Sequence, residues 1–205
     1  KDLTSISFVA EQSIKDYIER NPILKTKTMH LNGNYSIDSE VGNELYNLFG
    51  EYKNVYLYFD GNKSERHIEE YKKTIDAIDE IVKTIRKHNL SPLEEVMYAY
   101  DLVREKVYTR ELDTESDRIS RDLSSVLFGD KIVCAGYVAI FNSVLKNLGI
   151  SVMDYKLIKK ENNKKGHVRS LVYVKDKKYH VNGVFMFDPT WDSKKCEGDK
   201  SYLRS

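Results

Sequence analysis

Cysteine is scarce in this chain of 205 residues, which contains only Cys134 and Cys196. Two cysteines are too few for the disulfide framework of a small secreted domain, and these two lack the close spacing of a zinc site. The histidines that would have to complete a Cys/His metal site are scattered along the sequence, so that alternative is weak. We expect no metal and no other cofactor.

A bias of charge is also missing, because 33 basic residues face 32 acidic ones and the net charge is +1. Such a chain has no electrostatic signature of nucleic-acid or acidic-membrane binding. Proline and tryptophan are rare, and no apolar run approaches the length of a membrane span. We expect no nucleic-acid partner and no membrane span, and the oligomeric state stays open. The start at Lys1 indicates a trimmed chain, and together with the composition it favours an exported or cell-surface bacterial protein.

Hydrophobic periodicity predicts an α+β chain with two parts. Residues 1–65 read as a small α+β extension, with a hairpin-type turn at Asn32-Gly33, a helix capped by Ser39 and a strand at residues 55–59. Residues 66–205 are predicted to form the larger domain.

The larger domain begins with an amphipathic helix over residues 66–88. Ser91-Pro92 then restarts a helix, with Ser91 as N-cap and Glu94 in the capping-box position. After a charged loop at 109–122 and one further helix, runs rich in β-branched residues after residue 151 predict the strands of an antiparallel sheet.

The further helix follows the turn signal Gly129-Asp130 and ends at Gly149, a residue suited to a left-handed C-cap. Its apolar residues occupy almost the whole circumference, which predicts a buried helix. Cys134 falls in the first turn, where unpaired N–H groups and the helix dipole favour an anion such as a thiolate. A lone cysteine in an apolar run is more often a small buried hydrophobe, so a catalytic reading needs a base elsewhere in the sequence.

A base and a carboxylate do follow downstream. His167 stands at the edge of a predicted strand, directly after Gly166, and Asp188 ends another strand. A helix packed on an antiparallel sheet can bring Cys134, His167 and Asp188 together as nucleophile, base and orienting carboxylate of cysteine acyl-transfer chemistry.

The order of these motifs resembles the transglutaminase-like superfamily of papain-type folds, over about residues 91–193. The motifs that carry the resemblance are Cys134-Ala135-Gly136-Tyr137, Leu148-Gly149-Ile150, Gly166-His167 and Asp188-Pro189-Thr190-Trp191-Asp192. The resemblance implies a papain/transglutaminase-like core and assigns the triad to Cys134, His167 and Asp188.

Two features depart from that superfamily. Arg169 stands where many members have an aromatic residue. The Trp that precedes the catalytic helix in animal transglutaminases is missing here, so the second oxyanion donor is unassigned. Tyr137, Gly166 and Trp191 are candidates for substrate binding or support of the site, with Trp191 expected as a packing anchor beneath the triad.

The remaining candidates have simpler interpretations. His180 alternates with apolar neighbours and is expected to be structural within a strand, and Cys196 lies in a polar tail as a bystander. The leading hypothesis is a cysteine enzyme that acts on peptide or glutamine amides through a thioester, which water or an amine resolves. The alternative is a catalytically inactive protein-interaction module of the same superfamily.

Overall fold

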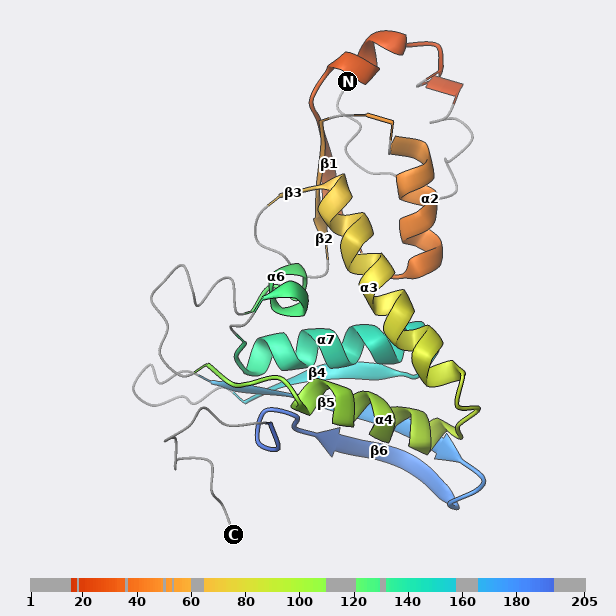
Figure 1. Cartoon of the computed structure of the whole chain (residues 1–205), viewed down its shortest axis with the longest axis vertical. Coiled ribbons are helices and arrows are strands. Elements are labelled where there is room, and N and C mark those ends of the chain that lie inside the picture. The colour runs from red at the N-terminus through yellow and green to blue at the C-terminus, as the bar shows by residue number, and fades with distance from the viewer. Residues whose placement is uncertain are drawn as a thin grey trace. The chain divides into compact units, whose positions relative to one another are not determined.

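A computed structural model describes residues 16–17, 19–35, 37–49, 51–52, 54–59, 65–109, 121–129, 132–157 and 166–193 of the chain (Figure 1). The chain forms two compact units, Lys1–Asp76 and Ala77–Ser205, and each combines helices with a small sheet. The α+β class is therefore confirmed. The division between the units lies within the long helix α3 (Ile68–Arg86), and the sequence-based boundary after residue 65 stays a prediction.

Unit 1 is a three-stranded sheet with helices. The strands lie in the order β1-β2-β3, with β1 parallel to β2 and β2 antiparallel to β3. Leu57, Phe59 and Tyr71 are completely buried in its core. The elements of this unit before α3 are η2 (Pro22–Thr26), β1 (Met29–Tyr35), α2 (Ser39–Phe49), β2 (Val55–Phe59) and β3 (Arg66–His67).

The hairpin-type turn predicted at Asn32-Gly33 is wrong, because β1 runs straight through these two residues. The register with β2 instead shifts between Leu31 and Asn34, as at a β-bulge. A glycine inside a strand often marks such a bulge, and the parallel pairing of β1 with β2 requires no tight turn.

Unit 2 carries the candidate site on a second three-stranded sheet, which is antiparallel throughout in the order β4-β5-β6. The short helix α6 was not predicted, since its six residues are too few to show a period. Besides the second half of α3, the unit contains α4 (Pro92–Arg104), α6 (Leu123–Phe128), α7 (Cys134–Asn147), β4 (Val152–Leu157), β5 (His167–Asp176) and β6 (Val181–Phe187).

One face of this sheet is covered by helices, because α4 and α7 both pack on β5 (Figure 1). Along β5, side chains on the helix-covered face are buried and alternate with more exposed ones on the other face. The buried residues include Val168, Ser170, Val172 and Val174. The opposite face stays open, and Met153, Val184 and Met186 are all more than half exposed on it.

The ends of α4 and α7 follow the predicted capping signals. The Ser91 N–H donates to Glu94 Oε2 at 2.8 Å, which completes a capping box. Gly149 has a φ of +81°, and the N–H of Ile150 donates to the Leu145 carbonyl at 2.9 Å. This pattern is a Schellman motif, which is most easily formed with glycine at the left-handed position.

Candidate active site

Helix α7 presents Cys134 at its first position, after Val133 as N-cap. The apolar residues of this helix are buried, as its sequence predicted. Polar contacts fix it further: Ser170 Oγ donates to Asn142 Oδ1 at 2.6 Å, and Asn142 Nδ2 donates to Asp154 Oδ1 at 2.7 Å. These bonds tie α7 to β5 and β4, so the thiol has a fixed position relative to the sheet.

The Cys134 thiol contacts the start of β5. It is a free thiol, partly buried, and the His167 ring and the backbone N–H of Val168 lie close enough to lower its pKa. His167 is the first residue of β5 and pairs with Leu157 of β4 in the sheet register. The side chain of His167 is 23% exposed, so solvent or a substrate can still reach it.

The second partner of His167 is Asp188, the residue after β6. His167 Nε2 lies 2.7 Å from Asp188 Oδ2, which leaves Nδ1 as the ring nitrogen for the thiol. The carboxylate is only 12% exposed, so its pairing with the imidazole is little screened by water. The structure thus brings Cys134, His167 and Asp188 into one chain of contacts, while their catalytic roles stay predictions.

The turn after Asp188 is anchored by Tyr100 of α4. The Tyr100 hydroxyl donates to Asp192 Oδ2 at 2.6 Å. Burial of the ring is the larger cause, and this hydrogen bond the next, of a raised pKa of the tyrosine. The Tyr100 ring also packs edge-on against Phe141 of α7 and Phe187 of β6. Helix α4 therefore positions the segment that carries the carboxylate, a role that the sequence did not reveal.

The electrostatics of the site favour an ion pair between thiolate and imidazolium. Burial raises the pKa of the Cys134 thiol, but the hydrogen bonds from His167 and Val168 and the charges of His167 and Arg121 outweigh it, so the net pKa is lowered. The hydrogen bonds to Asp188 and Cys134 raise the pKa of His167 to about 9, against the opposing effect of burial. A thiol with a lowered pKa beside a protonated imidazole is the reactive form of a cysteine nucleophile.

The prediction that Trp191 is a packing anchor beneath the triad is wrong, because its side chain is 42% exposed. Its ring stacks on the His167 ring with centroids 5.5 Å apart and an interplanar angle of 5°. The Arg169 guanidinium lies 4.1 Å from the centroid of the indole. Trp191 therefore covers the His167–Asp188 pair from the solvent side, with part of its own surface left in water.

Replacing Trp191 with alanine should cost less than the roughly 3–5 kcal/mol expected for a fully buried aromatic residue. It should instead slow alkylation of Cys134 at acidic pH, because water then screens the His167–Asp188 pair and the imidazolium is less stable. Thermal melts beside iodoacetamide labelling of Cys134 measure both effects, with Trp191→Phe as the variant that keeps a stacked ring. A large loss of stability with unchanged labelling would contradict this assignment.

The remaining sequence-predicted residues lie around the Cys134–His167–Asp188 cluster or outside it. Tyr137 is fully buried and its hydroxyl donates to the Lys106 carbonyl at 2.7 Å, so it supports α7 from inside. Gly166 is exposed beside His167. His180 does not lie within a strand: it ends the turn before β6 with a φ of 55°, and it is exposed. Cys196 lies outside the described residues.

Arg169 is a residue of this site to which sequence reasoning gave no role. It lies two positions after His167, so the period of a strand places both on one face. Arg169 Nε is 2.8 Å from Asp188 Oδ2. Its sequence signal was a departure, because many members of the superfamily that the motifs resemble have an aromatic residue at this position.

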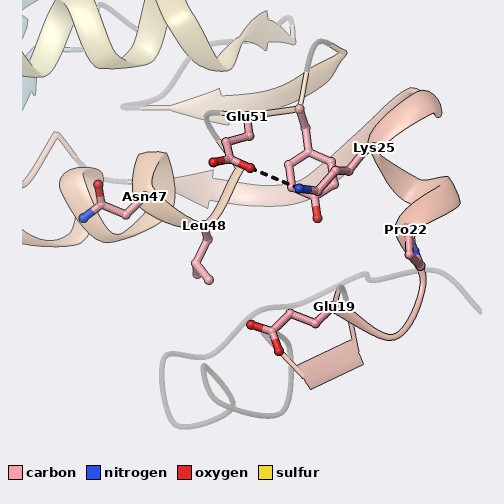
Figure 2. Close-up of a pocket in the computed structure, with 7 residues that line it drawn as sticks. Glu19, Pro22, Lys25, Asn47, Leu48 and Glu51 are labelled. Carbon is pink, nitrogen blue, oxygen red and sulfur yellow. Dashed lines mark hydrogen bonds and ion pairs between the residues drawn. The ribbon is translucent and has the colours of Figure 1, made fainter.

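A separate hollow of about 510 Å³ lies in unit 1 (Figure 2). Lys25 Nζ and Glu51 Oε2 form an ion pair of 3.1 Å across part of it. None of Cys134, His167 and Asp188 lines this hollow, since all three belong to unit 2. Its lining consists of Glu19, Pro22, Lys25, Asn47, Leu48, Glu51 and Tyr52.

No known protein-family model matches the chain, and no curated protein matches it. Within the described parts of the chain, no cluster of three or more His, Cys, Asp or Glu residues is arranged to hold a metal ion. No helix in those parts is long and apolar enough to cross a membrane.

Proposed function

We propose that the chain is a transglutaminase-like cysteine enzyme with a papain-like core, acting on peptide or glutamine amides through a thioester. The observation that carries this proposal is the contact chain from Cys134 through His167 to Asp188, built from three segments far apart in the sequence. The first residue of α7, the first residue of β5 and the residue after β6 supply one group each, in the roles of nucleophile, base and orienting carboxylate.

In this mechanism the Cys134 thiolate attacks the carbonyl carbon of the amide and forms a C–S bond. The carbonyl electron pair moves to the oxygen, and the tetrahedral intermediate collapses with cleavage of the C–N bond. His167 gives its proton to the departing amine or ammonia. Water or a primary amine then attacks the thioester, His167 takes up a proton from that nucleophile, and Cys134 leaves as the thiolate.

The first turn of α7 is the natural donor for the oxyanion of that intermediate. The N–H groups of Gly136 and Tyr137 both donate to the Val133 carbonyl. The earlier N–H groups of a helix have no partner within it, and the one at Cys134 lies beside the attacking sulfur. We assign it as the first oxyanion donor.

The second candidate function is a protein-interaction module without catalysis. The observation that favours it is the open face of the β4-β5-β6 sheet, on which Met153, Val184 and Met186 are 63%, 64% and 54% exposed. An exposed apolar patch commonly marks an interaction site. The two functions differ in whether the Cys134 thiol is activated.

Incubation with glutamine-containing peptides and a fluorescent primary amine tests the leading proposal. We expect a mass change in the peptide from deamidation, amine incorporation or cleavage, and its type identifies the reaction. The matched control is Cys134→Ala, which removes the nucleophile and should abolish every such product. Products that persist in Cys134→Ala, or Cys134 alkylation no faster than in the unfolded chain, would reject the enzyme and favour the interaction module.

A further inference from the structure

Arg169 makes contacts that go beyond packing. Its Nε lies 2.8 Å from Asp188 Oδ2, the same oxygen that His167 Nε2 approaches at 2.7 Å. The Nε–H is not aligned for a hydrogen bond with that oxygen, so the contact is an ion pair. Nη1 donates to Met186 Sδ at 3.4 Å, which fixes the plane of the guanidinium. The side chain is only 12% exposed.

One carboxylate oxygen thus serves two cationic groups, and the two nitrogens lie within about 5.5 Å of each other. His167, with a pKa raised to about 9, can lose its proton at alkaline pH, whereas a guanidinium stays charged under all working conditions. Asp188 therefore keeps a cationic partner in every state of the His167 ring.

We propose that Arg169 is a positioning residue of the triad, which orients the Asp188 carboxylate and limits how strongly that carboxylate binds the protonated His167. This inference rests on the proposed function, since it concerns the same three residues. In the proposed reaction, an imidazolium that is held less tightly by Asp188 is a stronger acid. It therefore gives its proton more readily to the departing amine.

Electrostatics predicts that Arg169 lowers the pKa of His167. A fixed positive charge at that separation destabilises the imidazolium by about half a pKa unit even at the dielectric constant of water, and by more in a partly buried site. Other groups act on the same ring from each neighbouring element. From α7 the Cys134 thiol pairs with it, and after β6 the Asp188 carboxylate does. The charge of Asp188 also acts on Tyr100 of α4, whose hydroxyl donates to Asp192, and Arg121 before α6 acts on the thiol.

A purely structural alternative is that Arg169 only clamps the Trp191 ring. Lysine separates the two roles, because it keeps the charge but lacks the planar group that stacks on an indole. The test uses Arg169→Gln and Arg169→Lys, both in a Cys196→Ser chain so that only Cys134 reacts. The matched control is Arg104→Gln, which removes an arginine whose partner Asp101 lies on the exposed side of α4.

The measurement is the rate of iodoacetamide alkylation of Cys134 as a function of pH, in which the alkaline step reports loss of the His167 proton. We expect Arg169→Gln to move this step upward by about half a pH unit or more, whereas Arg169→Lys and Arg104→Gln stay near the parent value. If Arg169→Gln does not fold, Arg169→Met, which keeps the contact with Trp191, replaces it.

An unchanged alkaline step in Arg169→Gln or Arg169→Met, or an equal shift in Arg169→Lys, would overturn the role assigned to Arg169. Failure of the proposed enzyme function gives a different result. The Cys134 alkylation rate of the parent chain would then rise in a single step with pH, with no reactive thiolate at acidic pH.

Discussion

Replacing Asp188 with asparagine is expected to lower turnover of any amide substrate on the order of 10²-fold or more while the fold is kept. The amide has the same size as the carboxyl group and can still accept from the backbone N–H of Trp191, which lies 3.4 Å from Oδ1 of Asp188. It cannot stabilise an imidazolium, however, and it leaves Arg169 without its anionic partner beside His167. The pKa of His167, raised to about 9 mainly by Asp188, should fall toward its ordinary value.

The alkylation profile of Cys134 measures this directly, because its alkaline step should move down in Asp188→Asn. The matched control is Asp101→Asn, the same chemical change at a carboxylate that is 59% exposed and pairs with Arg104. A profile for Asp188→Asn that overlays the parent would remove Asp188 from the triad, provided that thermal melts show both variants folded.

The second large effect is expected for His167→Ala. Without the imidazolium, the burial that already raises the pKa of the Cys134 thiol is no longer outweighed. At about pH 5 an ordinary thiol with a pKa of about 8.5 is thiolate in fewer than about one molecule in a thousand. A thiolate of lower pKa is intrinsically less nucleophilic, which offsets part of the difference. We therefore expect alkylation at this pH to slow by more than about tenfold.

His88→Ala is the control for this variant, because His88 is an exposed residue of the same unit with no contact to the thiol. It should alkylate like the parent chain. Equal rates in His167→Ala and the parent at acidic pH would show that the thiol is not activated by this histidine.

Much of unit 2 could be predicted because its sequence signals are local. Apolar residues around the whole circumference predicted the burial of α7, and Gly149 predicted where it stops. Ser91 and Glu94 predicted the start of α4. In unit 1 the same kind of reasoning failed at Asn32-Gly33, because a dipeptide typical of turns also suits a bulge, and only the pairing with β2 decides between them.

The contact of Cys134, His167 and Asp188 could be expected from the order of the motifs, whereas its surroundings could not. Burial of Trp191 was inferred from its size and rarity, but exposure depends on which residues surround it, and contacts with His167 and Arg169 leave its side chain 42% exposed. The bond from Tyr100 to Asp192 joins residues 92 positions apart, and no local pattern reports a contact of that kind.

The central claim is that the folded chain holds Cys134 as a thiolate paired with protonated His167. The rate of iodoacetamide alkylation of Cys134 against pH, in the Cys196→Ser chain with otherwise native sequence, tests it most directly. The account predicts substantial reactivity that persists well below pH 7 and a second step near pH 9, where His167 loses its proton. A single rise with its midpoint at about 8.5 or above, as for an ordinary or merely buried thiol, would contradict it.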